Sequence, residues 1–293
     1  MKHLLLALSL LLSTSLYGQI GPDGTGTVYG YYIGPYIDIG WSNADLAAAD
    51  LSGANLAGAR LGGVNFSGAL LSNANLAGAD LAAADLAGAD LAGADLAGVQ
   101  LILADLSGTN LTGANLAGVK SGNIIGTPSL PPGYQIVNGY IVGPGVVLLT
   151  ARVQYSDLSG ADLSNTDLRS ANLAYSDLSG ADFTNASLYD ANLIGANLTN
   201  ADLSGANLFG ADFTNADLTG AIISSTTTFS TDLNMNWFSS QGAIVPTGTI
   251  ITNNYTLETY SSTDLENWTL IKSETIESSE DILFLKSRVV EAE

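Results

Sequence analysis

Carboxylates are the most abundant chemically active side chains of this 293-residue chain. It contains 28 Asp and Glu residues against 8 Lys and Arg, which gives a net charge of −20. Paired carboxylates can act as general acid and base, and clustered carboxylates can bind Ca²⁺. Cysteine is absent, and the single histidine is His3. Beyond the N-terminal segment, these counts exclude Ser-His-Asp and Cys-His catalysis, Cys/His metal clusters and disulfides.

A five-residue repeat determines where most of the aspartates lie. Residues 44–118 form fifteen units with Leu at the central position, except for Phe66. Ala usually stands two positions earlier, with Asp or Asn between the two. Residues 146–225 form sixteen further units, of which the first two are weak. The central residues that flank the gap, Leu116 and Leu148, are 32 positions apart, so the two arrays do not share a frame.

A period of five fits neither an α-helix nor an uninterrupted strand. Within each unit the two apolar positions alternate with a polar one, which is typical of a very short strand with two inward side chains. Gly or Ser at the fifth position, as in Gly53 and Gly58, favours a turn before the next unit. The sequence therefore predicts a β-solenoid whose coils pair with their neighbours.

The pattern Ala-(Asp/Asn)-Leu-x-x, as in residues 54–58, resembles the pentapeptide-repeat family over 155 of the 293 residues. The resemblance implies an all-β fold, a right-handed quadrilateral β-helix with four units per coil and about four coils per array. It also implies that the central residue and the Ala two positions before it point inward. Residues twenty apart would then stack, so that Phe66 lies between Leu46 and Leu86 and Arg60 lies above Asp80.

Twenty-residue coils would place Asp162, Asp182 and Asp202 in one acidic column. This column is the strongest candidate for Ca²⁺ binding, because Ca²⁺ prefers oxygen ligands. A straight row of side chains on a rigid face does not easily enclose an ion, and a residue that recurs in every coil is more typical of a surface pattern. We therefore expect a solvated acidic face, no resident metal, no cofactor and no enzymatic activity.

Outward aromatic residues are the clearest departures from the repeat. Tyr155 and Tyr175 are twenty apart, and so are Tyr189 and Phe209, so each pair should form a short stack. Such stacks are typical of a surface for a protein or glycan partner. They are more typical of cross-strand pairs that only stabilise the coils, and both interpretations stay open. Other departures from the repeat are Arg60, Leu70, Gln100 and Arg169.

Residues 1–18 have the pattern of a secretory signal peptide. Lys2 and His3 precede a run of apolar residues from Leu4 to Leu12, and small or polar residues follow. The run is too short to span a bilayer. We therefore expect export to the periplasm, the cell surface or the extracellular space, and no membrane insertion once the signal is removed.

The segments around the arrays indicate hairpins and caps. We expect a header hairpin in residues 19–43 and a linker with a second hairpin in 119–145, where Asn138-Gly139 favours a type I′ turn. Residues 226–293 predict a β-rich cap or small module, with strands at 255–258, 268–271 and 282–285. An uncapped solenoid end exposes apolar side chains and strand edges, so association into homo-oligomers through the ends is also expected where caps are missing.

These features favour an exported, non-enzymatic structural or binding scaffold, an acidic rod that presents a surface to an unknown protein or glycan. The alternative is DNA mimicry, because some members of the resembled family are acidic rods that bind the type II topoisomerase gyrase. The net charge fits this alternative, but an export signal argues against a cytosolic partner. Direct binding of nucleic acid is not expected, because phosphate contacts require Lys and Arg.

Overall fold

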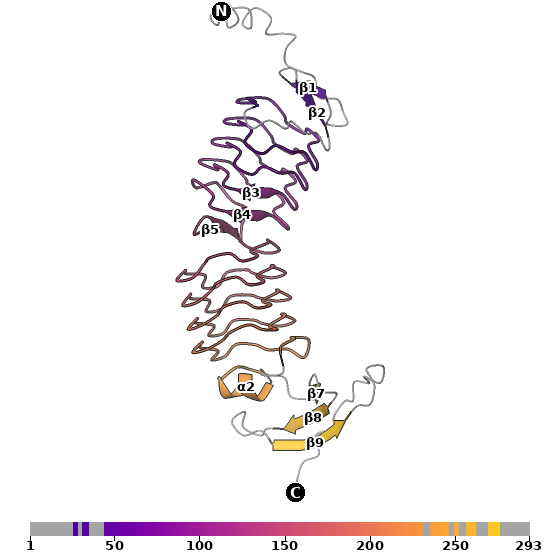
Figure 1. Cartoon of the computed structure of the whole chain (residues 1–293), viewed down its shortest axis with the longest axis vertical. Helices are drawn as coiled ribbons and strands as arrows, with labels where there is room; N and C mark the ends of the chain where they lie inside the picture. The colour runs from indigo at the N-terminus through magenta and orange to yellow at the C-terminus, as the bar shows by residue number, and fades with distance from the viewer. Residues whose placement is uncertain are drawn as a thin grey trace, which may run out of the picture. The chain divides into compact units, whose positions relative to one another are not determined.

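A computed structural model provides the structure of the chain, which forms two compact units, Met1–Leu148 and Leu149–Glu293 (Figure 1). The structure describes residues 26–28, 31–34, 44–230, 235–245, 249–251, 256–261 and 269–275.

Both units are built from stacked coils of twenty residues. Asp45 pairs with Asn65 in a parallel bridge, and the same pairing of residues twenty apart recurs through both arrays. The backbone N–H of Leu46 donates to the carbonyl of Asn65 at 2.8 Å, and the N–H of Asn65 donates to the carbonyl of Ala44 at 2.9 Å. These bonds join each coil to the next, so the predicted all-β solenoid with four units per coil is confirmed.

The core of each coil consists of the central residue and the Ala two positions before it. Leu46, Ala49 and Leu51 are fully buried, and the same alternation continues along both arrays. Phe66 is fully buried in the column between Leu46 and Leu86, as predicted. Each fully buried Leu contributes roughly 1.5–3 kcal/mol of transfer free energy, so this regular column of side chains dominates the stability of the coils.

A hydrogen-bonded turn separates consecutive units. The N–H of Ala54 donates to the carbonyl of Leu51 at 2.9 Å, and Gly53 between them has a φ of +68°. A positive φ at the third residue of the turn is the signature of type II geometry, which explains the recurring glycine. The Oδ1 atom of Asp50 accepts the N–H of Ser52 at 3.1 Å, so the Asp or Asn of each unit fixes the entry to the turn.

The second predicted hairpin is confirmed. Strands β5 (Gln135–Val137) and β6 (Tyr140–Val142) pair antiparallel, with Val137 opposite Tyr140. Asn138 and Gly139 both have positive φ, +49° and +78°, as a type I′ turn requires. The Oγ atom of Ser121 accepts the N–H of Ile141 at 2.9 Å and so ties the hairpin to the last coil of the first unit.

The remaining strands of the first unit are short. β1 (Gly26–Val28) and β2 (Tyr31–Ile33) pair antiparallel within the predicted header. β3 (Gln100–Ile102) and β4 (Lys120–Gly122) pair parallel in adjacent coils. Val147, which the repeat frame assigns to the second array, bridges to Lys120 and therefore extends the first unit.

A short helix covers the last coil of the second unit, where the sequence predicted only β structure. Helix α2 (Met235–Ser240) has six residues, and its Phe238 is fully buried with its ring centroid 5.9 Å from that of Phe213. The N–H of Ile223 donates to the carbonyl of Ile244 at 2.9 Å, which joins the segment after the helix to the coil. No helix in the described part of the chain is long and apolar enough to cross a membrane.

Strands β7 (Thr249–Ile251), β8 (Thr256–Ser261) and β9 (Thr269–Thr275) form an antiparallel sheet in that order. β8 and β9 overlap the strands predicted at 255–258 and 268–271. The predicted strand at 282–285 and the signal segment 1–18 lie outside the described residues.

Candidate functional site

The four faces of the second unit differ in charge. Each face carries a column of outward residues at the Asp/Asn position, joined by bridges between residues twenty apart. Two adjacent columns are acidic. One consists of Asp157, Asp177, Asn197 and Asp217, and the other consists of Asp162, Asp182 and Asp202. One further column consists of Arg152, Asn172, Asn192 and Asp212, whose formal charges cancel. This last column is the middle of the face that we describe as the candidate site.

Stacked aromatic rings border this neutral column. The rings of Tyr155 and Tyr175 have centroids 5.3 Å apart and planes inclined by 8°. The rings of Tyr189 and Phe209 have centroids 5.6 Å apart, also inclined by 8°. All four side chains are exposed, from 40% for Tyr189 to 73% for Tyr155. The two predicted stacks therefore exist and remain accessible.

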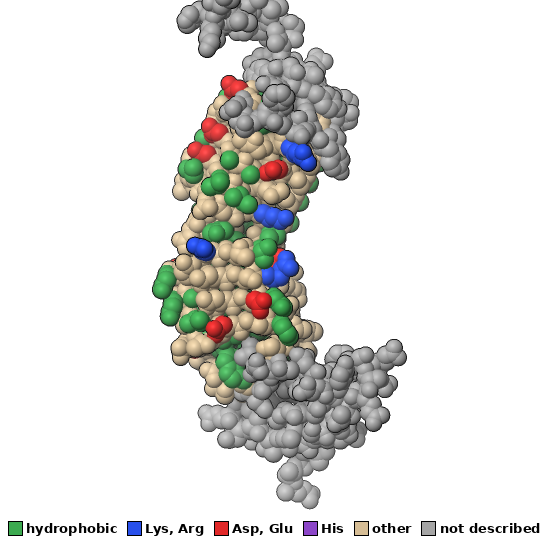
Figure 2. Space-filling model, viewed as in Figure 1, with side chains coloured by type: hydrophobic (Ala, Val, Ile, Leu, Met, Phe, Trp, Pro, Cys, Tyr) green, Lys and Arg blue, Asp and Glu red, His purple; other side chains and the backbone are tan. Residues whose placement is uncertain are grey.

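The two stacks flank the same face. Tyr189 lies in the turn closed by the bond from Ala191 N–H to the Leu188 carbonyl, just before the strand segment of Asn192. Tyr175 lies in the turn closed by the bond from Ser176 N–H to the Leu173 carbonyl, just after the segment of Asn172. We call the column from Arg152 to Asp212 together with the two stacks the aromatic-edged face. Figure 2 shows hydrophobic side chains along both margins of this part of the molecule, with polar surface between them.

Tyr155 and Tyr175 occupy turn positions with a left-handed backbone, each with a φ of +58°. They are the only aromatic residues with positive φ in the described part of the chain. This conformation costs a residue with a side chain roughly 1–2 kcal/mol relative to the right-handed region, and Gly or Asn occupies most equivalent positions. A Cβ atom at Gly195 in the next coil would lie 2.6 Å from Cδ1 of Tyr175, so the ring covers that backbone. The stack is thus kept at a strained position.

On the other edge, Arg169 pairs with Asp167 across the turn. Its Nε and Nη2 atoms donate to Oδ1 and Oδ2 of Asp167 at 2.8 and 2.7 Å. The bidentate pair raises the pKa of the Arg169 guanidinium, chiefly through the hydrogen bond and then through the charge of Asp167. It neutralises the one carboxylate in the column on the Tyr189/Phe209 side of the aromatic-edged face, so that column and this face both carry little net charge.

The proposed calcium ligands do form a column. Asp162 bridges to Asp182, and Asp182 bridges to Asp202. Each Oδ1 atom accepts the backbone N–H two residues further on, at 3.0, 2.8 and 2.8 Å. Across the described ranges, no three carboxylate or imidazole side chains converge on a point that could hold a metal ion. The geometry therefore assigns these aspartates a role in their own turns.

Hydrogen bonds of this kind lower the pKa of several repeat aspartates. The pKa of Asp157 lies below its usual value because the hydroxyl of Ser159 donates to it, and the Ser159 N–H adds to the effect. The Thr214 hydroxyl and then the Thr214 N–H lower the pKa of Asp212 in the same way. Asp212 is therefore ionised at neutral pH.

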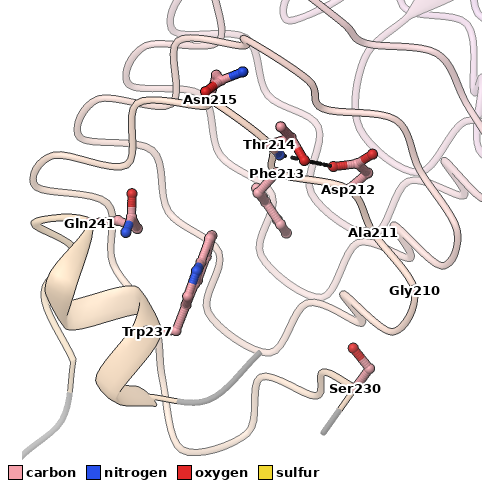
Figure 3. Close-up of a pocket in the computed structure, with 9 residues that line it drawn as sticks. All are labelled: Gly210, Ala211, Asp212, Phe213, Thr214, Asn215, Ser230, Trp237 and Gln241. Atoms are coloured by element: carbon pink, nitrogen blue, oxygen red, sulfur yellow. Dashed lines mark hydrogen bonds between the residues drawn. The ribbon is translucent and has the colours of Figure 1, made fainter. Parts of the chain in front are cut away.

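A hollow of about 510 Å³ lies where the aromatic-edged face meets helix α2 (Figure 3). Trp237 and Gln241 come from the helix and the turn after it, and Asp212, Thr214 and Asn215 come from the last coil. Neither array carries an inserted loop that could form a cleft. Sequence reasoning missed Trp237 and Gln241 because the hollow depends on a helix that docks from outside the repeats, and no repeat signal marks those residues.

Comparisons with known proteins agree with this architecture. Eight copies of the family model for pentapeptide repeats match the chain, over residues 49–86, 74–118, 151–185 and 186–224. No curated protein matches it.

Solved structures that are similar to this chain include those of the next three proteins. HetL from the cyanobacterium Nostoc sp. strain PCC 7120, a pentapeptide repeat protein involved in heterocyst differentiation regulation, is 30% identical over 74% of this chain and 90% of its own, with a TM-score of 0.35. A second pentapeptide repeat protein of Nostoc PCC 7120 is 34% identical over 34% of this chain and 81% of its own, with a TM-score of 0.33. QnrB1, a plasmid-mediated fluoroquinolone resistance protein, is 21% identical over 69% of this chain and 79% of its own, with a TM-score of 0.28.

These TM-scores are low, so the repeat match and the twenty-residue bridge pattern carry the assignment. The right-handed quadrilateral β-helix expected from the sequence is the fold of this family. The chain belongs to the pentapeptide-repeat family.

Proposed function

We propose that this chain is an exported, non-enzymatic scaffold that binds a protein or glycan partner on its aromatic-edged face. The observation that carries the proposal is the contrast between faces of one rigid unit. The face between the Tyr155/Tyr175 and Tyr189/Phe209 stacks is neutral and aromatic, whereas two other faces carry three carboxylates each. A binding surface needs exposed area whose desolvation costs little free energy. Aromatic side chains supply such area, and they lose little conformational entropy when a partner binds.

The strained backbone of Tyr155 and Tyr175 supports a role beyond stability. Glycine would satisfy the same turn without strain, as it does at Gly195 and Gly205. Strain that persists at a surface position is commonly kept for function. The mechanism is geometrical: the coils hold the two stacks at fixed separation, so little conformational entropy is lost when a partner binds.

Export is supported by the charged start and the apolar run of residues 4–12, and by the absence of cysteine, which makes oxidative folding unnecessary. An acidic surface then serves solubility, because the −20 net charge opposes self-association. The alternative function, mimicry of DNA toward gyrase, would use the two acidic columns rather than the aromatic-edged face.

The test is affinity capture from the exported fraction with the full chain as bait. We expect a partner that the Tyr155→Gly/Tyr175→Gly double variant no longer retains. The matched control is Asn165→Gly/Asn185→Gly, which changes two left-handed turn residues in the same two coils but at the opposite corner. If both double variants lose the partner, or if both retain it, a role for this face is contradicted. Recovery of the mature chain from the cytoplasm would instead favour the gyrase alternative, which a supercoiling assay can then test.

A further inference from the structure

The hollow beside helix α2 continues the aromatic-edged face. Asp212 ends the column that begins at Arg152 and also lines the hollow. Asn215 occupies the same turn position as Tyr155 and Tyr175, three coils beyond the first and two beyond the second. Gly210 and Ser230 close the other side, where the Tyr189/Phe209 stack ends. A chain-like ligand lying on the face would therefore reach the hollow without changing direction.

One wall of the hollow is aromatic. Figure 3 shows the Trp237 indole projecting from α2 toward Phe213, with Gln241 beside it and Thr214 and Asn215 across the opening. Its ring centroid lies 6.1 Å from that of Phe213 at an angle of 52°, and the indole is half-buried. The negative face of an aromatic ring attracts polarised C–H groups, and one face of a sugar ring presents a row of them.

The rest of the lining is rich in hydrogen-bonding groups. The Thr214 hydroxyl donates to Oδ1 of Asp212, which leaves Oδ2 without a donor among the described residues. The Asn215 amide also has no hydrogen-bond partner among them, and Gln241 uses only Nε2, which donates to Ser240 Oγ at 3.1 Å. Carboxylate oxygens accept hydroxyl protons, and amide groups both donate and accept, which matches the alternating hydroxyls of a sugar.

Charge restricts the class of ligand. Asp212 is ionised at neutral pH, and Asp190 lies at the adjoining turn with its Oδ1 against Gly210. Among the described residues that line the hollow there is no Lys or Arg. Phosphate, uronate or sulfate groups would therefore be repelled, while neutral hydroxyls are not. A volume of about 510 Å³ lies within the usual range of small-molecule pockets, about 300–1,000 Å³.

We infer that this hollow is a saccharide subsite, which holds one end of a neutral glycan whose chain runs along the aromatic-edged face. Trp237 supplies the stacking wall, and Asp212, Asn215 and Gln241 supply the hydrogen bonds. The inference rests on the proposed function and names the ligand class for it. Spacing along the face agrees, since coils repeat every 4.7–4.9 Å or so, which is close to the length of one β-linked sugar residue.

The test is titration calorimetry of the full chain with four hexasaccharides: β-1,4-linked glucose, β-1,4-linked N-acetylglucosamine, β-1,4-linked mannose and, as the anionic comparison, α-1,4-linked galacturonate. We expect at least one neutral hexasaccharide to bind and galacturonate not to bind. Gln241→Ala and Asn215→Gly should each weaken that binding at least tenfold. Neither substitution touches the buried core, and Asn215→Gly suits the left-handed backbone at that position, where φ is +58°.

The matched control is Asn165→Gly, which makes the same change at the same turn position on another corner and should leave the affinity unchanged. A third variant, Trp237→Ala, should abolish binding, and its melting temperature shows whether the cap is still formed. Trp237→Phe should restore part of the affinity, because the stacking wall is retained.

Binding that Gln241→Ala and Asn215→Gly leave unchanged would overturn the subsite. If Tyr155→Gly/Tyr175→Gly still weakened that binding, the proposed function would survive without the subsite. Absence of binding by all neutral hexasaccharides, or tighter binding of galacturonate, would overturn the inference. In that case the proposed function is still tested separately, by the affinity capture of a protein partner.

Discussion

The ring of Tyr155 stacks on the ring of Tyr175 one coil further along, at a centroid distance of 5.3 Å. Both residues adopt a backbone conformation that glycine would adopt without strain. The stack recovers about 0.5–1.5 kcal/mol beyond area burial, while the two left-handed residues cost roughly 1–2 kcal/mol each. Stability alone therefore does not account for tyrosine at these two positions.

Because of this balance, the stability of the Tyr175→Gly variant tests whether the stack serves the stability of the coils or another role. Loss of stacking and release of strain nearly offset each other, so we expect the free energy of unfolding to change by less than about 1 kcal/mol. Urea unfolding followed by circular dichroism measures this change. A loss of several kcal/mol would instead assign the stack a structural role.

The inward assignment of the repeat alanines predicts the effect of overpacking. Ala94 is fully buried in the packed interior of the coil, so Ala94→Leu should lower the free energy of unfolding by about 1–3 kcal/mol. Ala117→Leu, which adds the same atoms at an exposed position, is the control. Equal melting temperatures for both variants would contradict the packing described for the core.

Stability should fall in acid through the turn aspartates. Hydrogen bonds in the folded state lower the pKa of four aspartates outside the hollow, Asp90, Asp105, Asp157 and Asp217. Their contribution is complete above the unfolded-state value of about 3.9 and is lost as the pH falls through the lower folded-state pKa.

Asparagine at these four positions keeps the Oδ1 acceptor but does not titrate. Between pH 6 and pH 3, the melting temperature of the fourfold Asp→Asn variant should therefore fall by less than that of the unaltered chain. A control with the same change in charge replaces Asp50, Asp80, Asp85 and Asp177 by Asn. If both fourfold variants respond to acid alike, the stabilising hydrogen bonds are not the source of the acid sensitivity.

The sequence was sufficient to predict the coils because their stability depends on a periodic pattern. Leu at the central position of the units and small residues two positions earlier determine which side chains are buried. The local backbone preferences of Asn138-Gly139 were sufficient to predict the turn between β5 and β6. The stacking of Tyr155 on Tyr175 followed from the twenty-residue coil.

The hollow could not be predicted in this way. A six-residue helix has too few turns to show an apolar period, and α2 forms against Phe213 through tertiary contacts. The role of Asp50 and its equivalents in the turns was also missed, because the repeat pattern gives the same Asp or Asn whether it serves solvation or a backbone hydrogen bond.

Calcium should not stabilise the acidic column. Asp162, Asp182 and Asp202 stand in a straight row and each directs Oδ1 to its own turn, so their oxygens do not converge on one point that could hold an ion. We expect the melting temperature to be the same with millimolar Ca²⁺ and with a chelator at constant ionic strength. A rise with Ca²⁺ that Asp182→Asn abolishes would show that the column does bind the ion.

The cap on the second unit should control both its stability and its association. Phe238 is fully buried against Phe213, Phe229 and Trp237, so Phe238→Ala should cost about 3–5 kcal/mol through the cavity that it leaves. Loosening α2 also uncovers the apolar end of the last coil, and we therefore expect concentration-dependent oligomers in analytical ultracentrifugation. Ser239→Ala on the same helix is the control and should stay as stable and as monodisperse as the unaltered chain. If Phe238→Ala unfolds more easily without associating, the cap stabilises the coil but does not prevent end-to-end contact.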